Sequence, residues 1–219
     1  ARTGPSTDYS RLTALPQGTR ATVTGREGEW VRLDYGAWIK AEEVQIVRMG
    51  TPVRSLIRSV RSQTGDGWTE VFFPLQTPVP ISVQQDGDTL ALTLHNTTAQ
   101  TDTIAVGPDR AISRLDWQQV APDRVQYTFR SASAQQWGYK LRYDGTTLIL
   151  SLRHPPQLSS NPQSLAGVTI LLDAGHGGPE DLGARGPTGY PEKDVTLIVT
   201  KLLRDRLEAR GAKVIMVRE

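Results

Sequence analysis

The chain has 219 residues, of which 37% are hydrophobic and 22% are charged, and its 25 basic and 23 acidic side chains give a formal net charge of +2. This is the composition of a globular protein, without the apolar run of about 18 residues that a membrane span needs, and its charges are too evenly spread to predict a nucleic-acid partner. The chain has no cysteine, which excludes a disulfide framework, a cysteine-ligated metal site and a thiol nucleophile.

Residues 1–49 show short alternating apolar patterns that glycine interrupts every few residues. Such a pattern predicts a small β-barrel. The Leu-Pro-Gln-Gly-Thr turn at 15–19, the Gly-Glu-Trp at 28–30 and the Trp-Ile at 38–39 resemble a bacterial SH3-type domain. In that family the module binds cell-wall peptides or packs against its neighbour. We interpret Trp30 and Trp38 as core or rim aromatics, with ligand stacking as the alternative.

Residues 50–155 are also dominated by strand patterns, and no convincing amphipathic helix interrupts them. Apolar residues alternate with polar ones at 90–94 and at 125–129, and a hairpin is predicted between 137–143 and 148–152. Several strands at this spacing predict a β-sandwich-like domain. The pattern and its position are weakly similar to the AMIN-type domains that precede cell-wall amidases. His95 and His154 have no partner at metal-ligand spacing, so we interpret them as hydrogen-bonded or solvent-facing.

Residues 156–166 form a predicted linker, because proline, serine and asparagine favour turns over a continuing strand. Residues 167–219 then change to an α/β pattern. The apolar runs at 168–172 and 214–217 predict two buried parallel strands, and apolar residues at helical spacing from about Lys193 predict a helix that ends near Gly211. The fold class is therefore multidomain: a small barrel, a β-sandwich-like domain and one βαβ unit of an open α/β domain.

His176 follows the first of these strands, and Glu192 stands near the start of the helix. Side chains gather at this edge of an α/β sheet, and the five glycines between the two residues allow the loop to fold back. An imidazole and a carboxylate are suitable ligands for Zn²⁺. A phosphate-binding loop is an alternative, although the chain lacks the accompanying Lys-Ser/Thr pair.

The motif Leu-Asp-Ala-Gly-His-Gly-Gly at 172–178, followed by Gly-Ala-Arg-Gly at 183–186 and Gly189-x-x-Glu192-Lys193, resembles the opening of the zinc-dependent N-acetylmuramoyl-L-alanine amidase domain. The resemblance implies that His176 and Glu192 are zinc ligands. It also implies that Asp173 holds the loop or orients His176. Glu180 and Asp181 are interpreted as solvated or loop-capping, with assistance to a ligand as the alternative.

The same resemblance implies hydrolysis, by zinc-activated water, of the amide between N-acetylmuramic acid and L-alanine of the peptidoglycan stem peptide. The third ligand, a histidine, and the catalytic Glu are expected beyond Glu219, so residues 167–219 hold a partial site and the chain by itself is expected to be nearly inactive. We expect a location in the periplasm or cell envelope, and the β domains can pack on the amidase domain. A non-catalytic wall-binding or scaffold protein is the alternative function.

Overall fold

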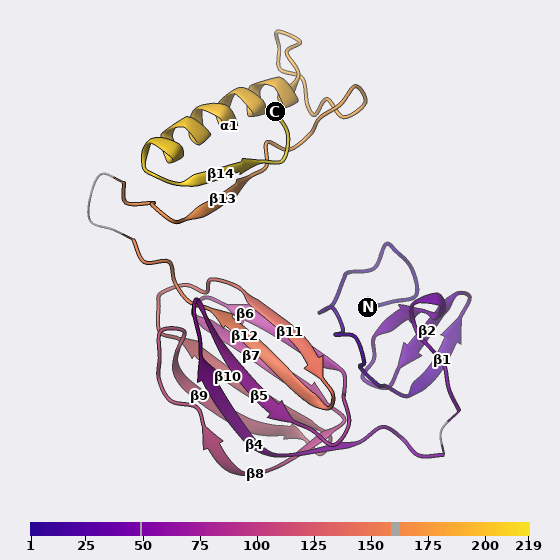
Figure 1. Ribbon diagram of the computed structural model, residues 1–219. Coiled ribbons are helices and arrows are strands. Elements are labelled where there is room, and N and C mark those ends of the chain that lie inside the picture. Colours follow the sequence, from indigo (N-terminus) through magenta and orange to yellow (C-terminus); the bar gives the residue numbers. More distant parts are fainter. Residues whose placement is uncertain (49, 159–162) are drawn as a thin grey trace. The chain divides into compact units, whose positions relative to one another are not determined.

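The computed structural model describes residues 1–48, 50–158 and 163–219 (Figure 1). The chain divides into two compact units, Ala1–Pro155 and Pro156–Glu219. The first unit contains only β-sheets and one short 3-10 helix among its described residues, and the second contains one α-helix between two strands. Each unit is described separately below.

The N-terminal sheet of the first unit is antiparallel and contains β1 (Val23–Glu27), β2 (Trp30–Leu33) and β3 (Trp38–Lys40). A 3-10 helix, Ala41–Glu43, follows β3. Arg2 forms an isolated bridge with Trp38, so the N-terminal segment extends this sheet beyond β3. The buried positions belong to Val31, Leu33 and Ala37. Trp30 and Trp38 are half-buried, as expected for residues at the rim of a small β domain.

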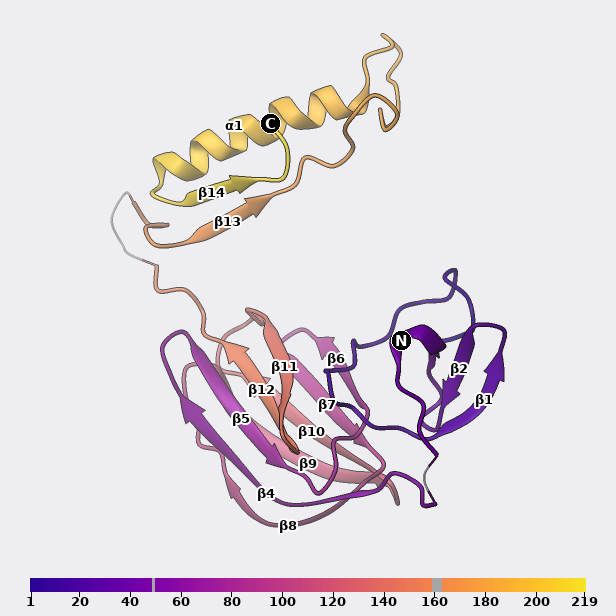
Figure 2. The same ribbon diagram turned by 45° about the vertical axis from the view of Figure 1, so that its right-hand side comes forward.

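Two larger sheets form the rest of the first unit (Figure 2). The four-stranded sheet has the order β6 (Ile81–Asp86), β7 (Thr89–His95), β10 (Arg124–Ser131) and β9 (Ile112–Ala121). The five-stranded sheet has the order β11 (Tyr139–Asp144), β12 (Thr147–Arg153), β5 (Trp68–Pro74), β4 (Ser55–Thr64) and β8 (Thr97–Ala105). The strands pair antiparallel except β4 and β8, which are parallel. The predicted hairpin is present as β11 and β12, paired from Tyr139–Leu152 to Asp144–Thr147.

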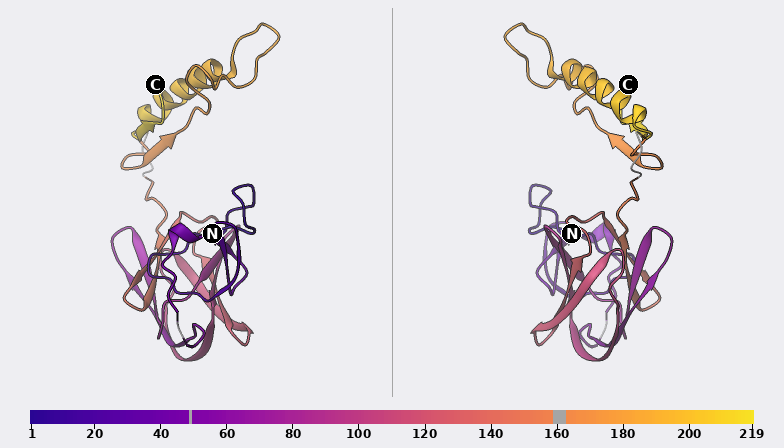
Figure 3. Two further views of the ribbon diagram at one scale, coloured as in Figure 1. Left: turned by 90° about the vertical axis from the view of Figure 1, so that its right-hand side faces the viewer. Right: turned by 90° about the vertical axis from the view of Figure 1, so that its left-hand side faces the viewer.

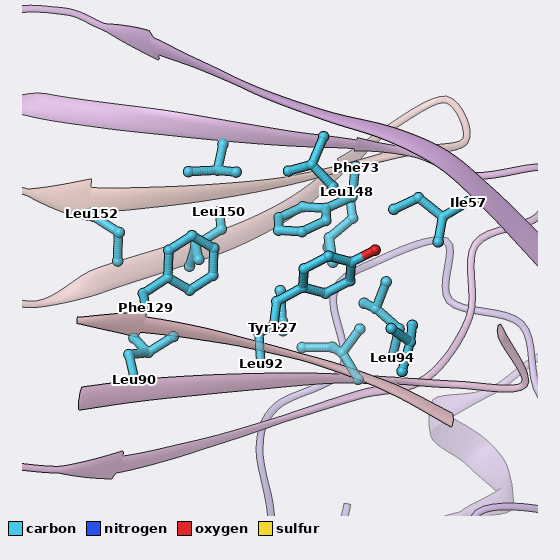
Figure 4. Packing of buried hydrophobic residues seen from close by; sticks show 14 of the residues in the cluster. Ile57, Phe73, Leu90, Leu92, Leu94, Tyr127, Phe129, Leu148, Leu150 and Leu152 are labelled. Atoms are coloured by element: carbon cyan, nitrogen blue, oxygen red, sulfur yellow. The ribbon is translucent and has the colours of Figure 1, made fainter. Parts of the chain in front are cut away.

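A continuous apolar core lies between these two sheets (Figure 4). The five-stranded sheet contributes Phe73 and the four-stranded sheet contributes Tyr127 and Phe129, and all three are almost fully buried. The ring of Phe73 meets Tyr127 edge-on at 5.0 Å between centroids and Phe129 at 6.4 Å. Such edge-to-face contacts add to the stabilisation that burial alone provides. The alternating leucines 90, 92 and 94 point into this core, as their period-2 pattern predicts.

The second unit consists of β13 (Thr169–Leu172), α1 (Glu192–Ala209) and β14 (Lys213–Met216). The two strands are parallel and in register from Thr169–Lys213 to Leu172–Met216, and α1 lies along them (Figure 3). Gly211, with φ of +89°, ends the helix as predicted. No helix in the described ranges has both the length and the apolar composition that crossing a membrane requires.

The prediction that β13 and β14 are buried is wrong for the described residues. Leu171 is 65% exposed and Ile215 is 45% exposed. The apolar residues Val199 and Leu202 of α1 are also exposed. The physical reason is that the second unit has a single helix, which covers only one face of its two-stranded sheet.

Candidate metal centre

The loop 173–191 connects the carboxyl end of β13 to the first turn of α1, and the two predicted ligands lie at this end of the unit, His176 in the loop and Glu192 in the helix. His176 lies four residues after β13, and Glu192 is the first residue of α1. The backbone of His176 has φ of +43°, a left-handed conformation that is uncommon for a residue other than glycine. This conformation turns the chain sharply immediately before Gly177 and Gly178.

Backbone hydrogen bonds attach the loop to the start of the helix. The first N–H groups of a helix have no partner within the helix. Here the N–H of Glu192 donates to the carbonyl of Ala184 at 2.8 Å, and the N–H of Lys193 donates to that of Leu182 at 3.2 Å. In return, the N–H of Ala184 donates to Oε2 of Glu192 at 2.9 Å. The Glu192 carboxylate is therefore held at the positive end of the helix dipole.

The structure brings the two predicted ligands together. Nε2 of His176 lies 3.5 Å from Oε2 of Glu192, and the two side chains are 37% and 43% exposed. Two ligands about 2.1 Å from a tetrahedral ion lie about 3.4 Å apart. The spacing of this pair therefore fits two corners of a zinc coordination shell.

Gly183 is the residue that allows this close approach. A Cβ atom at Gly183 would lie 2.8 Å from Cβ of Glu192 and 2.8 Å from Cδ2 of His176. Gly183 also has φ of +67°, in the region that favours glycine. The loop thus passes directly beside the His–Glu pair, and only a residue without a side chain fits there.

The carboxylate bonded to the His176 ring belongs to Asp181. Nδ1 of His176 lies 2.7 Å from Oδ1 of Asp181. Asp173 instead accepts a hydrogen bond from the N–H of Gly175 at 2.8 Å, so it holds the loop, one of the two roles predicted for it. The hydrogen bond with Asp181 is the main cause that raises the pKa of His176. The charges of Asp181 and Glu192 raise it as well, whereas desolvation and Arg218 lower it.

Arg218, two residues after β14, links the two sides of the site. Its guanidinium donates to the carbonyl of Gly175 through Nε at 3.1 Å and Nη2 at 2.9 Å, and Nη2 also donates to the carbonyl of Lys193 at 2.7 Å. Lys193 Nζ donates to the carbonyl of Gly178 at 2.7 Å. These contacts connect the loop that carries His176 to the helix turn that carries Glu192.

His176 and Glu192 provide some, but not all, of the ligands that a zinc ion needs. In the described part of the chain, no group of three or more His, Asp or Glu side chains is arranged to hold an ion. Asp181 is engaged with the opposite ring nitrogen, so Nε2 of His176 and the Glu192 carboxylate are the two donors. A protein zinc site has at least three protein ligands. The unit therefore presents two of them.

The two other histidines, His95 and His154, belong to the first unit. His95 is buried, with Nε2 3.1 Å from Ser82 Oγ and its ring 4.8 Å from that of Tyr35. His154 is buried with Nε2 2.8 Å from Oγ1 of Thr69, which donates to Asp109. Both histidines are therefore hydrogen-bonded and buried, which is one of the two arrangements predicted for them, and neither faces solvent.

Sequence reasoning did not assign the roles of Gly183, Asp181 and Arg218. The sequence predicts that Asp181 is solvated or caps the loop, and assistance to a ligand is only the alternative. The spacing of five residues between His176 and Asp181 becomes informative only once the loop is known to close on itself, through the N–H of Gly177 and the carbonyl of Asp181 at 2.9 Å.

Comparisons with known proteins match two parts of the chain to family models. Residues 170–219 match the family model described as N-acetylmuramoyl-L-alanine amidase, and residues 1–45 match that of the bacterial SH3 domain. A germination-specific N-acetylmuramoyl-L-alanine amidase of Bacillus subtilis is 56% identical over 55 residues, which are 25% of this chain and 22% of that protein. The N-acetylmuramoyl-L-alanine amidase AmiC of Neisseria meningitidis is 49% identical over 49 residues, 22% of this chain and 12% of AmiC.

A further relative aligns along the whole chain. It is the Bacillus subtilis protein named "Putative N-acetylmuramoyl-L-alanine amidase YrvJ", which is 22% identical over 290 aligned positions that span 100% of this chain and 54% of YrvJ. The chain thus spans about half the length of this relative and less than a quarter of the other two.

Proposed function

We propose that the protein carrying this chain is a peptidoglycan hydrolase, which cleaves the amide between N-acetylmuramic acid and L-alanine of the stem peptide, with Zn²⁺ held by His176 and Glu192. The observation that carries the proposal is the 3.5 Å separation of His176 Nε2 and Glu192 Oε2, inside the segment that matches the amidase family model. The alternative of a phosphate-binding loop has less support, because Glu192 places a carboxylate where a phosphate would lie.

The residues of the second unit have distinct parts in this proposal. His176 offers the Nε2 lone pair, and Glu192 offers a carboxylate that the Ala184 N–H already orients. Gly183 leaves space for both side chains, and Arg218 forms hydrogen bonds with the backbone segments that carry them. When bound, zinc lowers the pKa of a water and polarises the scissile carbonyl.

We further propose that a third ligand, a histidine, and a general-base glutamate come from a segment beyond residue 219 in the whole protein. A carboxylate near the attacking water accepts its proton and passes it to the leaving amine. With two donors, residues 167–219 by themselves are expected to bind zinc weakly and to hydrolyse little or no substrate. A non-catalytic wall-binding protein remains the competing function, because three donors do not converge in the described ranges.

The β domains would place the enzyme on its substrate in the periplasm or cell envelope. The domain division proposed is 1–49, 50–155, a linker at 156–166, and 167–219. We propose wall binding or control of access for the first two domains, the second of which has the AMIN-like strand pattern. Packing of these domains on the amidase domain is one way to control access.

The test uses the whole protein that carries this chain. Elemental analysis is expected to give about one zinc per chain in the wild type and a clear loss of zinc in His176→Ala and Glu192→Ala. Release of stem peptides from purified peptidoglycan should fall at least 100-fold in both variants, since each removes a ligand. Glu208→Ala is the matched control, because Glu208 is exposed near the opposite end of the same helix.

Zinc that is retained in both variants would contradict the ligand assignment. A wild-type protein that binds peptidoglycan but releases no stem peptide would support the non-catalytic function instead.

A further inference from the structure

The hydrogen bond between Asp181 and His176 determines which ring nitrogen faces Glu192. The Nδ1–Oδ1 distance of 2.7 Å is that of a charge-assisted hydrogen bond. An ionised carboxylate only accepts hydrogen bonds, so Nδ1 must carry the proton. A neutral imidazole has one N–H group, and the lone pair is therefore on Nε2, the atom that lies 3.5 Å from Glu192.

The backbone holds Asp181 in place for this contact. The N–H of Gly177 donates to the carbonyl of Asp181 at 2.9 Å, and the two residues form an isolated antiparallel bridge. The loop 177–181 is thereby closed, and its last side chain returns to the ring of the residue that precedes the loop.

The other carboxylates near the loop do not perform this role. Asp173 Oδ1 accepts from the Gly175 N–H. Within the described residues, the carboxylates that lie within 4.0 Å of the His176 ring nitrogens belong to Asp181 and Glu192. Glu180 is adjacent to Asp181 in sequence and makes no such contact with the ring.

We propose that Asp181 is a positioning residue that fixes His176 as the Nδ1–H tautomer and so directs the Nε2 lone pair toward Glu192. A metal-ligating histidine usually donates its second N–H to a carboxylate or a carbonyl, and loss of that partner costs 10- to 100-fold in metal affinity. The metal part of this inference rests on the proposed function. The tautomer part does not, because it follows from hydrogen bonding alone.

The tautomer is measured in the complete chain without metal, by long-range ¹H–¹⁵N correlation spectra at about pH 9, above the ordinary histidine pKa of about 6.5. The signals of His176 are assigned by their absence in His176→Gln. The wild type should show a protonated Nδ1 and an unprotonated Nε2. Asp181→Ala should shift the ring toward the Nε2–H form that free imidazole side chains prefer, whereas Glu180→Ala, the matched control, should leave the spectrum unchanged.

Asp181→Asn is the conservative variant, since its amide oxygen can still accept from Nδ1 and should retain much of the wild-type tautomer. A wild-type ring in the Nε2–H form, or a ring that is unchanged in folded Asp181→Ala, would overturn the proposal.

Zinc titration of the whole protein supplies the second measurement. Asp181→Ala should weaken zinc binding 10- to 100-fold relative to wild type and to Glu180→Ala. Equal affinities would overturn the positioning role. A wild-type protein that shows the Nδ1–H tautomer and takes up no zinc would contradict the proposed function while the tautomer assignment stands, so the two failures are distinguishable.

Discussion

Oδ2 of Asp34 accepts a hydrogen bond from Nδ2 of Asn96 at 2.8 Å, and this bond joins the N-terminal sheet to the turn between β7 and β8. The same oxygen accepts from the N–H of Thr22 at 3.0 Å. Asn96 has φ of +52°, a conformation that asparagine tolerates better than most residues. Beside this bond, the ring of Tyr35 packs on that of His95. The N-terminal sheet is therefore attached to the larger sheets through a partly buried polar contact.

We predict that Asp34→Ala destabilises the first unit by about 1–3 kcal/mol, because it leaves the Thr22 N–H and the Asn96 amide without their acceptor in a partly buried site. Denaturant unfolding of residues 1–155 measures the effect. Glu42→Ala is the control, since it removes only an exposed ion pair with Lys40, 3.3 Å long, and should change stability by less than about 0.5 kcal/mol. Equal effects of the two substitutions would show that Asp34 does not attach the sheet.

The stability of this unit should fall as the pH is lowered from about 6.5 toward 4. Burial and the nearby charge of Arg124 lower the pKa of His95 from 6.5 to about 4, although Asp123 and Asp34 oppose this. The unfolded chain therefore binds a proton in this range before the folded one does, and protonation favours unfolding. The full shift corresponds to about 3 kcal/mol, and partial solvent screening reduces it to about 2 kcal/mol.

Urea unfolding at a series of pH values measures this dependence. His95→Gln removes the titrating group and should flatten the profile between pH 6.5 and 4. An equally steep profile in the variant would assign the acid sensitivity to other groups.

Two adjacent phenylalanines of β5 should differ strongly in their contribution to stability. Phe73 is fully buried between the sheets, so Phe73→Ala should cost about 3–5 kcal/mol through lost burial and the cavity left behind. Phe72 points to the opposite face, where the guanidinium of Arg61 lies 4.5 Å from its ring centroid. Phe72→Ala should cost only about 1 kcal/mol. Denaturant midpoints of the two variants give the comparison, and similar values would contradict the assignment of the two faces.

Gly183→Ala should weaken zinc binding without unfolding the protein. The added methyl group would lie within 2.9 Å of Oε2 of Glu192 and closer still to the His176 ring, so it separates the two donors. The positive φ adds a backbone cost of about 1 kcal/mol. Gly186→Ala is the matched control, because a Cβ there meets nothing within 4 Å. Zinc competition with a chelating dye should show weaker zinc binding in Gly183→Ala only. Equal zinc affinities of the two variants would contradict the prediction that a side chain at position 183 separates His176 from Glu192.

Much of the local structure follows from the sequence because it depends on near neighbours. Alternation at 90–94 and 125–129 predicts strands with one buried face, and β7 and β10 have this arrangement. The periodic leucines and Gly211 predict both the extent and the end of α1. The glycine-rich loop predicts that His176 and Glu192 approach each other, whereas their role as metal ligands is implied only by the resemblance of the motif to the amidase family.

Contacts between residues without a shared periodicity were decided only by the tertiary structure. Periodicity does not indicate that Asp181 rather than Asp173 bonds to the His176 ring, because the choice depends on how the loop 177–181 closes. It likewise does not predict that Tyr35 covers His95, or that β13 and β14 keep an exposed face. The physical reason is that side-chain pairing and burial depend on the path of the whole backbone and on which elements pack together. The formation of a strand or helix, by contrast, can be predicted from the pattern of residues that are neighbours in the sequence.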